Sequence, residues 1–125
     1  MFVATVGCAA KQADVPLADI PKLQSLDEIM HANETIGGSI WSLQDKETFS
    51  AEDWANATDA SARMAALAAR SKEFSRGDAF NKYADILNTQ AKSLGAASEK
   101  QDPKAAAVAI GGMKDACRDC HAETR

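Results

Sequence analysis

Two cysteines and a histidine near the C-terminal end of the chain are the residues best suited to chemistry. Cys117, Cys120 and His121 form the pattern Cys-x-x-Cys-His in the segment Cys117-Arg118-Asp119-Cys120-His121. On a helix, positions i, i+3 and i+4 share one face, so both thiols and the imidazole can reach one flat group. Thiols at this spacing add to the two vinyl groups of a haem, and the adjoining histidine supplies an axial nitrogen to the iron. The motif therefore predicts one covalently attached haem c.

Two other uses of paired cysteines fit the sequence less well. A redox-active disulfide of the thioredoxin kind needs a strand-to-helix context, which is missing here. A structural zinc site needs four ligands, but the chain has three cysteines and two histidines, with no second Cys/His pair to complete the set. An odd number of thiols also excludes a disulfide framework in which every cysteine is paired. Haem attachment is the reading that the pattern favours.

The composition indicates a small helical domain. The 125 residues suffice for one hydrophobic core, and 46% of them are hydrophobic although only 6% are aromatic. Alanine-rich sequence with few β-branched runs favours closely packed helices over a sheet. The net charge is −4 with both signs interleaved, so no basic stripe suggests a nucleic-acid partner. The longest apolar run, residues 2–6, is far too short to span a bilayer.

Four amphipathic segments carry their own helix start signals. Ser25 to Glu28 forms a capping box, Ser50 is an N-cap followed by acidic residues, and Asp102-Pro103 places a capping acid before a proline. Helices are expected over about 25–43, 50–70, 77–94 (with Gly95 as a stop) and 103–123. Short connections favour an all-α, antiparallel up-down-up-down four-helix bundle. Residues 25–125 would form the haem-binding domain, and residues 1–24 a signal remnant and linker, or an extended N-terminal arm.

The bundle topology selects the residues that could meet the haem. The end of the fourth helix would lie level with the start of the first, the end of the second and the start of the third. The residues expected there are Leu26, Ile29, Met30, Asn33, Met64, Leu67, Ala68, Phe80, Tyr83 and Ala84. Trp41 and Trp54 are expected at the opposite end, as core residues.

Met30 is the candidate sixth ligand of the iron. It lies one turn into the first helix on the inward face, and a soft thioether suits haem iron. The alternatives are that Met30 is an ordinary core methionine lining the pocket, or that Met64 is the ligand. His31 is rotated by about 100° from Met30 and is expected in solvent.

With these residues in place, the sequence resembles the class II c-type cytochromes, the cytochrome c′ family and its six-coordinate relatives. The shared features are a haem motif within the last ten residues, four preceding helices and a methionine early in the first helix. The resemblance implies that Cys117 and Cys120 are thioether attachment points, His121 the proximal ligand and Met30 a distal ligand. Two departures stand out. Thr124 replaces a tyrosine that is common in the family, although Arg125 remains, and no arginine near the start of the first helix is available for the haem propionates.

Electron transfer is the function these observations favour. A His/Met haem in a small bundle has no substrate cavity and no positioned acid–base pair, so one-electron cycling of the iron, not enzymatic turnover, is expected. The alternatives are a five-coordinate binder of nitric oxide or carbon monoxide, and a bundle without haem. The expected partners are redox proteins, and a homodimer is compatible with the alanine-rich faces.

Covalent haem attachment implies export, because in this family the thiols are joined to haem outside the bacterial cytoplasm. The segment Thr5-Val6-Gly7-Cys8 resembles a lipobox, in which the cysteine becomes lipid-modified. A periplasmic location is therefore expected, and a lipid on Cys8 would tether the protein to the membrane. The alternative is a signal remnant in which Cys8 is a stray thiol.

Overall fold

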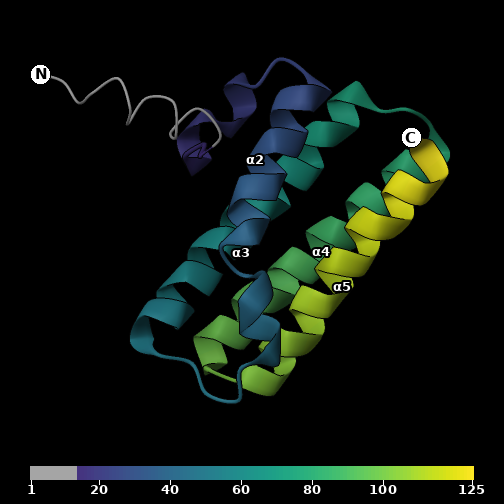
Figure 1. Cartoon of the computed structure of the whole chain (residues 1–125). Coiled ribbons are helices and arrows are strands. Elements are labelled where there is room, and N and C mark those ends of the chain that lie inside the picture. Colours follow the sequence, from purple (N-terminus) through teal and green to yellow (C-terminus); the bar gives the residue numbers. More distant parts are fainter. Residues whose placement is uncertain (1–13) are drawn as a thin grey trace, which may run out of the picture.

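Helices account for all the regular structure in residues 14–125, the part of the chain that the computed structural model describes (Figure 1). Four are α-helices: α2 (Leu26–Gly38), α3 (Ala51–Ser71), α4 (Asp78–Lys100) and α5 (Pro103–Thr124). Three are short 3-10 helices: η1 (Leu17–Lys22), η2 (Trp41–Asp45) and η3 (Lys72–Phe74). The predicted all-α, four-helix bundle is confirmed.

Three of the four predicted helix starts are fixed by side-chain caps. The Asp53 amide donates to Ser50 Oγ and the Ser50 amide to the Asp53 carboxylate, both at 3.0 Å, so α3 opens with a reciprocal capping box. At α5 the Ala105 amide donates to Asp102 Oδ1 at 3.1 Å. These bonds satisfy amides that the first turn of a helix leaves without partners.

The cap of α2 differs slightly from its prediction. The Glu28 amide donates to Ser25 Oγ at 3.2 Å, as a capping box requires. The Glu28 carboxylate, however, accepts from the amide of Gln24 at 2.7 Å, one residue before the N-cap. The helix start is therefore correct, while the reciprocal bond lies one residue earlier in the chain.

The predicted end of the first helix, near residue 43, is wrong. The α-helix stops at Gly38, and the chain turns through Ser39 and Ile40 into η2. Consecutive glycines, Gly37 and Gly38, weaken the helix at this point. Ser39 Oγ donates to the Ile36 carbonyl at 2.6 Å, and the Ser39 amide donates to the same oxygen at 3.1 Å, so one residue closes the end of the helix with two bonds. The apolar periodicity beyond Gly38 belongs to η2.

The predicted stop at Gly95 is also wrong, because α4 continues to Lys100 and ends at Gln101 with φ +50°. Gly95 serves packing instead of termination. A Cβ at this position would lie 2.6 Å from Ser61 Oγ of α3. Ser61 Oγ in turn donates to the Ala91 carbonyl at 2.7 Å, so the glycine lets α3 and α4 approach closely.

The core combines alanines at the helix contacts with a few large apolar side chains between them. Packing is most extensive between α3 and α4 and between α4 and α5, while α2 packs on α3, and η2 covers part of α5. Trp54 is buried and stacks against Phe49 with ring centroids 4.4 Å apart, in agreement with its prediction as a core residue. The fully buried large side chains include Ile29, Ile36, Met64, Leu67, Leu94, Ile110 and Met113.

Residues 14–24 of the expected arm lie against α3. Ile20 of η1 is buried in the core. Arg63 Nη1 donates to Asp14 Oδ1 at 2.6 Å, and Arg70 Nη2 donates to the Leu23 carbonyl at 2.6 Å. Cys8 and the lipobox-like segment lie outside the described residues.

No helix within residues 14–125 carries an apolar stretch long enough to cross a bilayer.

Candidate haem-binding site

A cavity of about 530 Å³ lies where the start of α2, the start of α4 and the end of α5 meet. Its volume falls in the range of cofactor pockets, roughly 300–1,000 Å³. The cavity exists because α2 packs on α3 and α5 packs on α4, while α2 and α5 make no extensive contact. The residues that line it include Leu26, Asp27, Met30, His31, Asn33, Glu34, Trp41, Ser71, Arg76, Phe80, Tyr83, Ala84, Leu87, Cys117, Cys120, His121 and Arg125.

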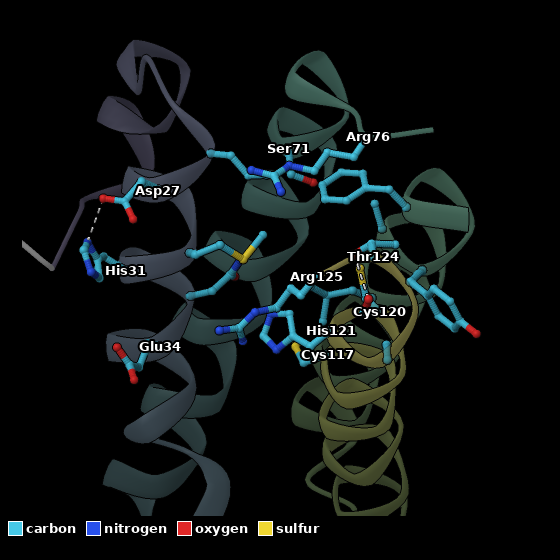
Figure 2. Close-up of a pocket in the computed structure, with 18 of the residues that line it drawn as sticks. Asp27, His31, Glu34, Ser71, Arg76, Cys117, Cys120, His121, Thr124 and Arg125 are labelled. Carbon is cyan, nitrogen blue, oxygen red and sulfur yellow. Dashed lines mark hydrogen bonds and ion pairs between the residues drawn. The ribbon is translucent and has the colours of Figure 1, made fainter. Parts of the chain in front are cut away.

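Helix α5 carries the cysteines and the histidine of the motif on the side that faces this cavity. Both cysteines are free thiols, and all three side chains line the cavity. Figure 2 shows them close together on one helix, below Thr124. Helix α5 continues through the motif to Thr124, whose Oγ1 donates to the Cys120 carbonyl at 2.7 Å. The backbone thus presents the three groups together.

Burial shifts the pKa values of Cys117 and His121. It raises the pKa of Cys117 to about 11, and the neighbouring Cys120 adds to the effect. It also lowers the pKa of His121, with a smaller contribution from the positive charge of Arg125. Near neutral pH the imidazole is therefore uncharged, which is the form that can donate a nitrogen lone pair to a metal.

One polar side chain that lines the cavity has a buried atom without a hydrogen-bond partner. Asn33 is only 8% exposed, and within residues 14–125 its Oδ1 has no hydrogen-bond partner. Buried polar atoms without partners are rare in native proteins, because each costs free energy. The groups that fit a haem are the two thiols, the imidazole and the thioether around one cavity, together with its apolar walls.

Most of the predicted pocket residues do line the cavity. From α2 these are Leu26, Met30 and Asn33, and from α4 they are Phe80, Tyr83 and Ala84. The Tyr83 hydroxyl donates to the Glu123 carboxylate, and this bond ties the outer wall of the cavity to α5. The same bond is the main reason why the pKa of Tyr83 is raised to about 12.

Met64 requires a correction, as do Ile29, Leu67 and Ala68. The structure places all four in the core, at most 1% exposed, and none of them lines the cavity. Met64, Leu67 and Ala68 belong to the buried face of α3, whose rotation the sequence did not predict, and Ile29 belongs to the buried face of α2. The buried face of α3 packs against α2 and α4, so only Ser71, its last residue, reaches the cavity.

Trp41 also requires a correction, since it lines the cavity and not the far end of the core. The cause is the early end of α2. After the turn at Gly38, the indole folds back over the last turn of the helix, where a Cβ on Gly37 would lie 2.8 Å from Trp41 Cε2. Gly37 therefore leaves the space in which Trp41 closes one side of the cavity.

Two charged residues on the rim of the cavity, His31 and Arg76, were not among the predicted pocket residues. His31 was expected in solvent and is largely exposed, but it lines the rim, with Nδ1 3.7 Å from Asp27 Oδ2. Arg76 was not singled out at all, because it lies in the connection between α3 and α4. The available signal was positional, since a connection at this end of the bundle must lie near the C-terminal motif.

The family model for cytochrome C′ matches residues 42–125, which include α3, α4, α5 and the Cys-x-x-Cys-His motif. The match leaves out α2 and therefore Met30. Neither a search of curated proteins nor a search of solved structures finds a significant match.

Proposed function

This chain belongs to the cytochrome c′ family, and from that premise we propose that it is a one-electron carrier with His121 and Met30 as axial ligands. Proteins of the family bind one covalently attached haem c, and so does this chain. They are generally electron carriers or gas binders. The choice between these two activities depends on the residue opposite His121.

The observation that supports the electron carrier is that Met30 and His121 line one cavity from different helices. Met30 belongs to α2 and His121 to α5, the two helices between which the cavity opens. A thioether opposite an imidazole raises the reduction potential of haem iron. With His121 and Met30 both holding a bound haem iron, the chemistry that the group would supply is the change between the ferric and ferrous states.

The surrounding side chains keep water away from such a centre. Leu26 and Leu87 line the cavity from α2 and α4, and Phe80 is 3% exposed. An apolar surrounding limits solvent access and tunes the potential of a bound metal centre. The helices α4 and α5 pack along their lengths, which favours a rigid site that changes little between oxidation states.

The absorption spectrum of the mature protein, with and without Met30, tests the proposal. We expect the wild type to be low-spin with a methionine–iron charge-transfer band, and Met30→Leu to lose this band and become high-spin. Met64→Leu is the matched control, because Met64 is fully buried outside the cavity and should leave the spectrum unchanged. A wild type that is high-spin in both oxidation states and binds carbon monoxide rapidly would instead identify a five-coordinate gas binder.

For the location of the protein, we propose the periplasm, with a lipid on Cys8 as membrane tether and redox proteins as partners. The support is the lipobox-like segment Thr5-Val6-Gly7-Cys8, together with the fact that covalent haem attachment requires the protein to be exported. Replacement of Cys8 by serine should move the protein from the detergent phase to the aqueous phase. Partition into detergent by both forms would contradict lipidation.

A further inference from the structure

The five arginines of the chain fall into two groups by their partners. Arg63 pairs with Asp14 and Asp59 at 2.6 Å, and Arg70 pairs with Glu73 at 2.9 Å. Arg118 pairs with Asp115 and Asp119, at 3.0 and 3.2 Å. Within the described residues, Arg76 and Arg125 pair with no carboxylate, and both of them line the cavity. The site thus holds two guanidinium groups that lack an anion.

We infer that Arg76 binds a propionate carboxylate of the haem. The inference rests on the haem occupying this cavity, and not on whether Met30 binds the iron. Haem carries two propionates, and α2 offers no arginine to hold them. Arginine is the side chain best suited to this task, because its planar guanidinium can donate two parallel hydrogen bonds to one carboxylate.

The position of Arg76 matches the chemistry of the cofactor. The vinyl groups and the propionates stand on opposite edges of the porphyrin, so a haem tethered through its vinyl groups directs its carboxylates away from the cysteines. Figure 2 shows Arg76 beside Ser71, at the end of the cavity far from Cys117. Arg76 therefore lies on the side where the propionates are expected.

The other charged groups around the cavity are less suited than Arg76 to bind a propionate. Asp27 and Glu34 of α2 would repel a carboxylate, and His31 is already shared with Asp27. Arg125 lies beside His121 in Figure 2. Arg125 is therefore placed near the proximal ligand, which leaves Arg76 as the cation at the propionate edge.

The backbone around Arg76 is held in one conformation. The Gly77 amide donates to Ser75 Oγ at 3.1 Å, so the hydroxyl closes a short turn around the arginine. Gly77 has φ +116°, a conformation that favours glycine. This turn joins η3 to α4, and it fixes the point from which the Arg76 side chain reaches the cavity.

An arginine next to a carboxylate lowers the pKa of that carboxylate by about 1–3 units. Removal of the Arg76 charge should therefore raise the propionate pKa by a similar amount. Ionisation of a propionate favours the ferric state, so the midpoint potential depends on pH around this pKa. At pH values above this pKa, loss of a nearby cation also lowers the midpoint potential. The reason is that a nearby positive charge disfavours the ferric haem, which carries one more positive charge than the ferrous haem.

The test is a set of midpoint potential–pH curves for the holoprotein, the variants Arg76→Gln and Arg76→Lys, and Lys72→Gln as control. Lys72 loses the same charge, but it pairs with Asp85 at 2.7 Å and does not line the cavity. In Arg76→Gln we expect the pH-dependent region to move up by about 1–3 units, with a smaller shift in Arg76→Lys and almost none in the control. Resonance Raman bands of the propionate bending modes give a second readout and should shift in both Arg76 variants but not in Lys72→Gln.

Identical curves for Arg76→Gln and Lys72→Gln, with unchanged propionate bands, would overturn the inference. So would a shift that appears in Arg125→Gln but not in Arg76→Gln, because Arg125 would then hold the carboxylate. If Arg76→Gln fails to fold, Arg76→Lys still decides, since a shorter reach and a point charge should change the propionate bands. Failure of the Met30 proposal is distinguishable, because it appears in the spin state of the wild type.

Discussion

The two helices that face each other across the cavity differ in how they are held. Helix α5 packs along α4 and is covered by η2, and it carries the attachment motif within its last turns. Helix α2 packs on α3, ends after 13 residues at a pair of glycines and contributes Met30 and Asn33. The family match includes α5 but not α2. Attachment of the haem therefore depends on a motif within one helix, α5. The wall of the cavity opposite α5 depends instead on the position of the shorter helix α2.

Substitution of each of the two histidines gives the strongest test of this difference between α5 and α2. Because His121 is assigned to the iron and His31 to the rim, His121→Ala should abolish the wild-type ligation, while His31→Ala should leave the spectrum almost unchanged. Absorption spectra of both variants in both oxidation states measure this difference. Equal effects of the two substitutions would remove the distinction between the α5 and α2 faces.

Met30 and Met64 sharpen the comparison, because their substitution should change the free energy of unfolding by different amounts. Met64 is fully buried, so Met64→Ala should lower the free energy of unfolding by about 2–5 kcal/mol. Met30 is only partly buried against the core, and Met30→Ala should destabilise the apoprotein less while changing the iron spectrum. Urea unfolding of both apoproteins gives the free energies. A larger loss for Met30→Ala would show that Met30 is a core residue after all.

The glycine pair at the end of α2 tests how the cavity wall is formed. A Cβ at Gly37 would press on the Trp41 indole, whereas at Gly38 nothing lies within 4 Å. Gly37→Ala should therefore cost about 1–3 kcal/mol from overpacking, and Trp41 fluorescence should change. Gly38→Ala serves as the control and should have little effect on either measurement. A neutral Gly37→Ala would mean that the indole does not depend on this space.

The smallest effect is expected far from the cavity, at the start of α3. Ser50→Ala removes the hydroxyl that accepts from Asp53 and should reduce stability by about 1 kcal/mol. The absorption spectrum should not change, because neither residue lines the cavity. A spectral change comparable to that of Met30→Leu would indicate that the bundle transmits strain to the haem site.

Local signals in the sequence predicted most of the fold. The caps at Ser50 and Asp102 gave the correct starts of α3 and α5, since capping depends on side chains within a few residues of the helix end. The helix end predicted at Gly95 was wrong because a glycine can either end a helix or allow another helix to pack closely against it. The neighbour that decides between them, Ser61, lies on another helix.

The site was predictable only where it is local. The spacing of Cys117, Cys120 and His121 directly specifies three groups on one helix face. Met64 was misplaced because the rotation of α3 is set by its packing against α2 and α4, which no pattern within α3 reveals. Arg76 was missed for a similar reason. Its role depends on which arginines find carboxylate partners in the folded chain, and that can be read only from the structure.

Mass spectrometry of the C-terminal peptide from exported protein tests the central claim most directly. The protein should be made in cells that contain the cytochrome c maturation machinery and then digested. We predict that the peptide containing Cys117 and Cys120 carries the mass of one haem, joined through both thioethers. The same peptide with two unmodified thiols would contradict the account.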